Sequence, residues 1–160
     1  MSYLYTLAFI KRGKEILMMN RVKDPWMGMW NGVGGKRSAD ENPLDCIVRE
    51  VIEETGIIVT KSMVKDKGIV TWNDDFKAFS NGLHLFFVEL PDDFNFDTPK
   101  PTDEGILDWK QPEWLLDKRN LGVSYNIPYF LNNVLYDDQK YHYHCIFKGN
   151  DLIKVEVEKI

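Results

Sequence analysis

Three glutamates follow an arginine in the segment Arg49-Glu50-Val51-Ile52-Glu53-Glu54. An α-helix turns about 100° per residue, so Glu50, Glu53 and Glu54 would share one helix face. Like charges at this spacing destabilise a helix by about 0.2–0.5 kcal/mol per pair. Mg²⁺ prefers oxygen ligands, so the segment favours a site for a divalent cation. The alternative is a solvated acidic face, because Arg49 and Glu53 have the i, i+4 spacing of a surface ion pair.

The acidic segment ends a longer pattern of fixed spacing. Gly35 is followed by five residues, Glu41, seven further residues and then the arginine–glutamate segment, which closes at Gly56-Ile57. At every defined position this pattern resembles the Nudix box, the signature of hydrolases that cut a nucleoside diphosphate linked to a further group X. The resemblance is strict over residues 35–57 and looser, by length and order of elements, over the rest of the chain.

The resemblance implies a single Nudix hydrolase domain over residues 1–160, of the α/β (α+β) class. Its fold would be the Nudix αβα sandwich, in which a mixed β-sheet carries a loop–helix–loop catalytic motif. A chain of 160 residues suits one domain with an ordinary core. The composition, 44% hydrophobic and 28% charged, is typical of a soluble globular protein.

The resemblance implies metal-binding roles for several residues of the box. Glu50 and Glu54 would be the principal ligands of Mg²⁺, with Mn²⁺ as an alternative ion. Glu53 would be a further ligand or the general base. The backbone carbonyl of Gly35 would point into the site and also bind the metal. The number of metal ions is left open.

Two further carboxylates and the arginine complete the expected catalytic set. By resemblance, Arg49 would fix the carboxylates through charge-assisted hydrogen bonds, and Glu41 would anchor it or reach the same cluster. The segment from Thr102 to Trp109 resembles the region of MutT-type enzymes that brings one carboxylate to the metal. We expect Glu104, more than Asp103, to be that ligand or the general base, although a lone loop glutamate usually faces solvent.

The substrate contacts are expected just before the box. The segment from Trp30 to Lys36 resembles enzymes that remove oxidised purine nucleoside triphosphates, and this implies that Asn31 hydrogen-bonds the base. Lys36 and Arg21 are candidate phosphate contacts, or alternatively solvated surface cations. The base-reading pair of aspartates in those enzymes falls near Gly122-Val123 here, so strict selectivity for oxidised guanine is not predicted.

The predicted reaction is Mg²⁺-dependent hydrolysis of a nucleoside triphosphate, such as 8-oxo-dGTP, to the monophosphate and pyrophosphate. A nucleotide sugar, a dinucleoside polyphosphate or an RNA 5′ end are alternative substrates. A module that senses a nucleotide without cutting it is the alternative from another class. Such modules commonly lack one or more glutamates of the box, and all are present here.

Charge and cysteine usage restrict the partners and the compartment. A net charge of −5 argues against a broad footprint on duplex DNA, but a small anionic substrate remains compatible because bound cations reverse the local sign. No apolar run has membrane-spanning length, and the first residues do not resemble a signal peptide. Cys46 and Cys145 lack metal or redox spacing, so we expect reduced thiols and a cytoplasmic protein. The oligomeric state, monomer or homodimer, is not predicted.

One helix is expected to carry the glutamates. Asn42 and Pro43 suit its first positions, and Gly56 suits a left-handed residue at its end. Leu44, Ile47, Val48 and Val51 follow helical spacing and would form its core-facing stripe. Shorter helices are expected at residues 112–116 and 128–135. Strands are expected at residues 3–10, 14–21, 30–33, 57–59, 68–72, 83–88, 105–109, 141–147 and 152–157, with a loop over 89–103.

Overall fold

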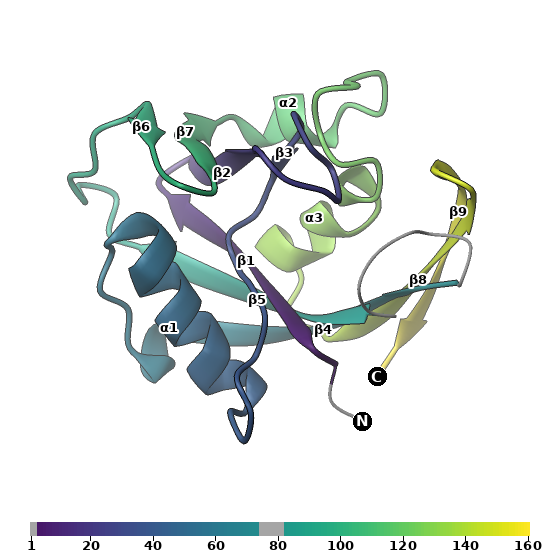
Figure 1. Cartoon of the computed structure of the whole chain (residues 1–160), viewed down its shortest axis with the longest axis horizontal. Helices are drawn as coiled ribbons and strands as arrows, with labels where there is room; N and C mark the ends of the chain where they lie inside the picture. The colour runs from purple at the N-terminus through teal and green to yellow at the C-terminus, as the bar shows by residue number, and fades with distance from the viewer. Residues whose placement is uncertain (1–2, 74–81) are drawn as a thin grey trace.

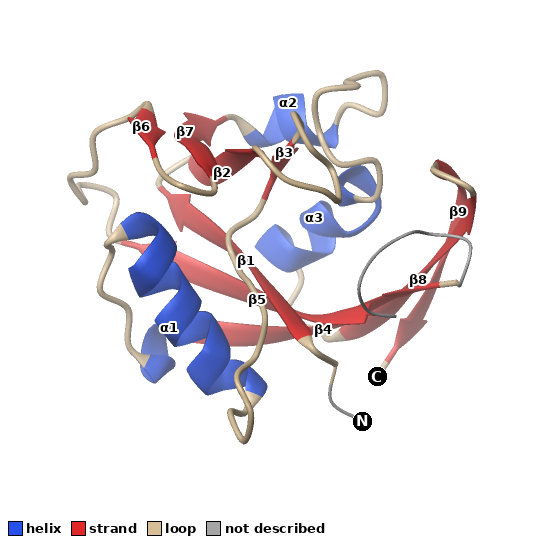
Figure 2. Ribbon diagram, viewed as in Figure 1, coloured by secondary structure: helices blue, strands red, loops and turns tan. Residues whose placement is uncertain are grey.

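The computed structural model describes residues 3–73 and 82–160. Its described strands form one sheet, with helix α1 (Pro43–Thr55) on one face and helices α2 (Pro112–Leu116) and α3 (Ile127–Tyr136) on the other (Figures 1 and 2). A 3₁₀ turn, η1, covers Lys61–Met63. The strands are β1 (Tyr5–Arg12), β2 (Glu15–Arg21), β3 (Trp30–Asn31), β4 (Val64–Trp72), β5 (Gly82–Leu90), β6 (Lys100–Pro101), β7 (Gly105–Lys110), β8 (Tyr141–Lys148) and β9 (Asp151–Lys159).

The sheet is mixed, as expected. Its strand order is β6-β7-β2-β1-β5-β4-β8-β9, and β3 pairs with β2 beside this path. Strands β1 and β5 are parallel, as are β4 and β8, whereas the other pairs are antiparallel. The prediction of an αβα sandwich with a mixed sheet is therefore confirmed. Among the residues described, no helix has both the length and the apolar character needed to cross a bilayer.

Strand β1 lies between two hydrophobic cores, one on each face of the sheet. Ala8 and Ile10 belong to the core under α1, while Leu7 and Phe9 belong to the core under α3. Successive side chains of a strand point to opposite faces, so a strand covered on both sides must be apolar at every position. This explains the continuous apolar run in the first strand, which is typical of the interior of a layered α/β domain.

The boundaries of α1 match the capping residues in the sequence. The Asn42 side chain accepts a hydrogen bond of 2.8 Å from the Asp45 N–H, and Gly56 ends the helix with φ 78°. These interactions satisfy backbone groups at both helix ends. The predicted stripe is confirmed, because Ile47 and Val51 are fully buried. Leu44 and Val48 pack against the same core, and Cys46 is also fully buried, as a packing residue would be.

Two expected strands differ from the structure. Residues 57–59 form no strand, although Ile57 and Val59 are buried and Ile58 is exposed as alternation requires. The segment finds no neighbouring strand before the η1 turn leads the chain into β4. The third expected strand is shortened to β3, and the chain then continues as the isolated bridge between Val33 and Ala8. The expected loop over 89–103 also contains the short strand β6.

Candidate active site

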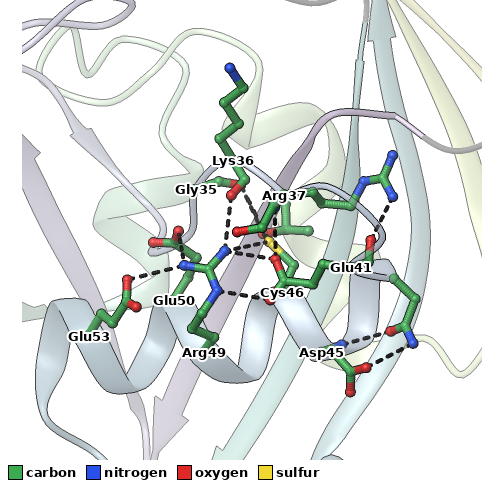
Figure 3. A network of polar contacts seen from close by, with 12 residues as sticks. Gly35, Lys36, Arg37, Glu41, Asp45, Cys46, Arg49, Glu50 and Glu53 are labelled. Carbon is green, nitrogen blue, oxygen red and sulfur yellow. Dashed lines mark hydrogen bonds and ion pairs between the residues drawn. The ribbon is translucent and has the colours of Figure 1, made fainter.

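The guanidinium of Arg49 lies between three carboxylates (Figure 3). It donates two hydrogen bonds of 2.8 Å to the two carboxylate oxygens of Glu41. Its Nη1 donates to Glu50 at 2.9 Å and to Glu53 at 3.1 Å. The bidentate bond from Arg49, aided by the Ser38 N–H, lowers the pKa of Glu41 to about 2. Arg49 therefore bonds all three carboxylates at once, and its role in catalysis stays a prediction.

The carboxylate of Glu50 occupies the space that a side chain at position 35 would need. Its side chain is 13% exposed, and burial raises its pKa above the ordinary value, against the lowering effect of Arg49. Glycine at position 35 is therefore a packing requirement of the site. The neighbouring Gly34 has a similar role, because a Cβ there would meet the Thr6 carbonyl of β1.

The carbonyl of Gly35 is turned toward β1. It accepts hydrogen bonds from the Thr6 N–H at 2.9 Å and from the Thr6 hydroxyl at 3.1 Å. A carbonyl oxygen has two lone pairs, so both are engaged by Thr6. Metal ligation by this oxygen stays a prediction, and the other candidate donors for a cation are side-chain carboxylates.

Glu54 is the most perturbed carboxylate of the helix. Burial raises the pKa of Glu54 to about 8, and the charges of Glu50 and Glu104 act in the same direction. Two interactions oppose this shift only in part: a hydrogen bond of 3.4 Å from the Gly34 N–H and the charge of Arg21 both lower the pKa of Glu54. A carboxylate held beside like charges in a partly dry site is the environment that a bound cation relieves.

A cavity of about 330 Å³ opens over this helix face. Its lining residues form two sets, one charged and one mainly aromatic and aliphatic, which we call the charged wall and the apolar wall. The charged wall is formed by Arg21, Lys23, Asp24, Lys36, Glu50, Glu54 and Glu104. The other wall includes Leu7, Trp26, Asn31, Val70, Trp72, Leu83, Asn126 and Phe130. A lining of both kinds suits a ligand that has an ionic part and an apolar part, as a nucleotide does.

The predicted site residues separate into two groups. Those that line the cavity are Arg21, Asn31, Gly35, Lys36, Glu50, Glu54 and Glu104. Glu53 and Arg49 do not line it, and Asp103 does not either. The Glu53 side chain is 58% exposed and pairs with Arg49, whereas Glu104 pairs with Lys23 at 3.4 Å. The cavity thus holds Glu50, Glu54 and Glu104 but leaves Glu53 outside.

Sequence reasoning missed most of the apolar wall. Trp26 follows β2, Trp72 ends β4, and Phe130 lies on α3. No common spacing connects these residues, because the sheet brings them together from distant parts of the chain. Asn126 was missed for a different reason: before Ile127-Pro128 it has the sequence position of an ordinary helix cap.

The donor set fits a hexacoordinate divalent cation shared with a substrate. No group of three or more His, Cys, Asp or Glu side chains within residues 3–73 and 82–160 is assembled to hold a metal alone. Mg²⁺ usually keeps several waters and binds through one or two carboxylates plus phosphate oxygens. Glu50 and Glu54, one helical turn apart and both on the cavity wall, supply such a pair.

Comparison with known proteins places this site in a family. The family model described as NUDIX domain matches residues 4–127. An uncharacterized Nudix hydrolase, YvcI of Bacillus subtilis, is 27% identical over 116 residues, which cover 68% of this chain and 67% of that protein. An oxidized purine nucleoside triphosphate hydrolase of Mus musculus is 36% identical over 58 residues, which cover 36% of this chain and 37% of that protein.

Solved structures show the same fold. The crystal structure of the mutator MutT protein from Bacillus halodurans has a TM-score of 0.76 at 22% identity, covering 98% of this chain and 97% of that chain. A bifunctional NMN adenylyltransferase/ADP ribose pyrophosphatase from Francisella tularensis, solved with AMP and a manganese ion, has a TM-score of 0.67 at 17% identity. It covers 84% of this chain and 41% of that chain. The family match, over most of the chain and including the whole box, shows that the chain belongs to the NUDIX domain family.

Proposed function

We propose that this Nudix hydrolase cuts a nucleoside triphosphate to the monophosphate and pyrophosphate in the presence of Mg²⁺, with Mn²⁺ as an alternative ion. The observation that carries the proposal is the divided cavity, in which Glu50 and Glu54 lie on the charged wall and Trp26 and Phe130 on the apolar wall. A nucleotide bound along it would present its phosphates to the carboxylate helix and its base to the aromatic side chains.

Glu50 and Glu54 would hold the cation. Burial and the neighbouring charges of Glu50 and Glu104 disfavour the ionised form of Glu54, and a cation would favour it. Bound Mg²⁺ would neutralise phosphate charge and lower the pKa of a coordinated water. Arg49 keeps Glu50 in place through the 2.9 Å bond, so the ligand does not have to be ordered when the cation arrives.

Arg21 and Lys36 would contact the phosphates. The Nε of Arg21 donates to the Pro25 carbonyl at 2.8 Å, which fixes the guanidinium at the cavity wall. Within residues 3–73 and 82–160 its terminal N–H groups make no hydrogen bond, so they are available to a ligand. The backbone carbonyl of Lys36 accepts from Arg49 at 3.1 Å, and its side chain extends away from the Arg49 network (Figure 3). Two cations on the charged wall would stabilise the negative charge of the transferred group.

Glu104 is the better placed of the two candidate bases. A general base must come within hydrogen-bond reach of the attacking water, directly or through one further water. Glu104 lines the cavity, whereas Glu53 lies outside it and is held by Arg49. We therefore assign proton removal to Glu104 and a supporting role in the ion-pair network to Glu53.

The test is a panel of substrates with product analysis. Ordinary and oxidised purine and pyrimidine triphosphates, ADP-ribose and a dinucleoside polyphosphate would be incubated with Mg²⁺ or with excess chelator. Release of pyrophosphate and monophosphate from a triphosphate, only with the metal, is the expected result. Binding without any product after long incubation would show a sensing module, and cleavage confined to ADP-ribose or the dinucleotide would replace the proposed substrate.

Oxidised purines belong in the panel because of the mouse relative, but strict selectivity for them is not expected. The expected place of the base-reading aspartates lies near Gly122 and Val123, which have no carboxylate. The carbonyl of Gly122 instead accepts a 2.8 Å hydrogen bond from the Trp30 N–H. Comparable rates on oxidised and ordinary purine triphosphates are therefore the expected outcome.

A further inference from the structure

The two edge strands of the sheet differ in how well they are protected from pairing. The strand order ends at β6 on one side and at β9 on the other (Figure 1). Strand β6 has two residues, one of them Pro101, and shortness and proline both keep an edge strand from pairing with another chain. Strand β9 has nine residues and contains neither proline nor glycine. Its outer edge is therefore open to pairing with a further strand.

The backbone groups on this outer edge belong to alternate residues of β9. The Ile160 N–H donates to the Lys140 carbonyl at 3.1 Å, on the side of β8. In an antiparallel strand, both backbone groups of one residue point to one side and those of the next residue point to the other. The N–H and C=O of Glu156 therefore point to β8, and those of Val155 and Val157 point outward. Within the described part of the chain these outward groups make no hydrogen bond.

The side chains of β9 are self-complementary about Val155. When a strand pairs antiparallel with a second copy of itself across a two-fold axis, residues at equal distances on either side of the axis face each other. With the axis at Val155, Lys154 faces Glu156 of the second copy, and Ile153 faces Val157. All four of these flanking side chains are exposed, Ile153 by 59% and Val157 by 50%. Opposite charges attract across the strands, and the aliphatic pair buries apolar area.

The neighbouring registers do not have this property. An axis at Lys154, Glu156 or Glu158 places a charged residue opposite its own copy. An axis at Val157 places Glu156 opposite Glu158. Like charges directly opposite each other destabilise a sheet. Charges that only protect an edge need no matching register, because any charge there discourages pairing. The match at Val155 therefore indicates a second copy of this chain as the partner.

We propose that two copies of this protein pair antiparallel through β9, with a two-fold axis at Val155, and join their sheets into one. The Val155 N–H and C=O bond those of Val155 in the second copy, and the Val157 N–H donates to the Ile153 carbonyl. The ladder covers Ile153–Val157, because the register of β9 with β8 shifts at Ile153. Five residues from each chain make a small interface, so the dimer dissociates on dilution.

This dimer does not rest on the proposed function. The structure describes all of β9, and none of its residues lines the cavity over α1. Its formation therefore needs no nucleotide or metal, and substitutions in β9 leave the residues of the cavity in place.

Sedimentation equilibrium over a wide range of protein concentration tests the pairing. The natural protein should reach twice the 18.7 kDa of one chain at high concentration and approach 18.7 kDa on dilution. Lys154→Glu and Glu156→Lys each place like charges opposite each other twice in the dimer, so each should raise the dimer Kd at least about tenfold. The combined variant reverses both charges and restores opposite pairs, so its Kd should lie within about threefold of the natural value.

Each other outcome contradicts the proposal. A natural protein that stays at 18.7 kDa overturns it and shows that the charges of β9 only protect an edge. A dimer with an unchanged Kd in both single variants pairs through another surface. A dimer that the combined variant does not restore pairs in another register. Thermal unfolding of each variant checks that the single chain is intact.

Proline on the outer edge tests the backbone bonds. Val157→Pro removes an N–H that points away from β8, which an edge strand tolerates. Its dimer Kd should rise at least about tenfold, because two bonds across the axis are lost. Lys159→Pro removes an outward N–H beyond the paired segment, so its Kd should stay within about threefold of the natural value. Equal Kd values for the two variants overturn the register about Val155.

Amide hydrogen exchange of the natural protein provides a test without substitutions. The N–H groups of Val155 and Val157 face outward in a single chain and are bonded in the dimer, so their protection should increase with protein concentration. The Glu156 N–H points to β8 in both states and should keep its protection. Dimerisation without a gain at Val155 and Val157 overturns the proposal, even if the variants do not fold.

Discussion

The carboxyl carbon of Glu50 lies 2.5 Å from the point that a Cβ atom on Gly35 would occupy. Atoms that are not bonded do not approach so closely, so a side chain at position 35 must displace the Glu50 carboxylate. Gly35, the first glycine of the box, and Glu50 are therefore one packing unit.

Gly35→Ala should reduce kcat much more than it reduces stability. A displacement of Glu50 by about 1 Å should lower kcat by roughly 100-fold. Overpacking should cost about 1–3 kcal/mol of the free energy of unfolding. Steady-state kinetics and urea unfolding measure the two effects. Gly149→Ala, at a glycine with φ 62° and no neighbouring atom within 4 Å, is the control that loses stability without losing activity. Retention of full activity in Gly35→Ala would contradict the packing argument.

Glu54→Gln should abolish activity and yet stabilise the metal-free protein at pH 8. The substitution removes a buried charge that lies beside Glu50 and Glu104. The gain in the free energy of unfolding should be roughly 2–5 kcal/mol in the presence of chelator. Addition of Mg²⁺ with a non-hydrolysable nucleotide should raise the Tm of the natural protein but not that of the variant. Glu113→Gln, an exposed residue of α2, is the matched control and should change neither quantity.

The metal-free protein should be less stable at pH 8 than at pH 5. The pKa of Glu54 is about 8 in the folded state and near 4.5 when unfolded, so the folded state holds the extra proton between these values. Stability therefore falls as the pH rises through this window, by a few kcal/mol. The contribution of Glu41 to stability changes with pH in the opposite direction, because Arg49 lowers the pKa of Glu41 to about 2. Its contribution is present above pH 4.5 and is lost as the pH falls toward 2. Urea unfolding with chelator from pH 3 to 9 should show a maximum near pH 5, and stability that rises up to pH 8 would be the opposite result.

Arg49→Lys should impair the site despite conserving charge. A lysine ammonium cannot reproduce the two parallel bonds to Glu41 while also contacting Glu50 and Glu53. Loss of these charge-assisted bonds should lower the free energy of unfolding by about 1.5–3 kcal/mol. The pKa of Glu41, measured by NMR titration, should rise toward its ordinary value. Arg119→Lys, at an exposed pair with Asp117, provides a comparison that should leave stability and activity nearly unchanged.

Glu104→Gln should lower kcat by roughly 10²–10⁴-fold and remove the acidic limb of the pH–rate profile. Glu53→Gln should lower kcat by less than about tenfold, since an exposed ion pair contributes little. Both variants are measured at saturating Mg²⁺ from pH 5 to 9. The reverse ranking would assign proton removal to Glu53 and would place its side chain in the cavity during turnover.

The parts of the structure that were predictable from the sequence depend on local interactions. Helix α1 begins at an asparagine cap and ends at a left-handed glycine, so its boundaries follow from Asn42 and Gly56. The segment 57–59 alternates like a strand, but strand formation needs a neighbouring strand, which only the tertiary fold provides. The places of Trp72 and Phe130 in the cavity could not be predicted for the same reason, because they depend on distant elements of the chain.

The loop before α1 is fastened to β1 through backbone atoms. Ala8 and Val33 exchange hydrogen bonds of 2.6 and 2.9 Å, and the Thr6 N–H bonds the Gly35 carbonyl. Such bonds require only that the flanking glycines be kept, whatever side chains the strand carries. Most side chains of the sheet can therefore change in evolution without moving helix α1. This tolerance fits a chain that overlays the Bacillus halodurans protein over nearly its whole length while sharing 22% of its residues.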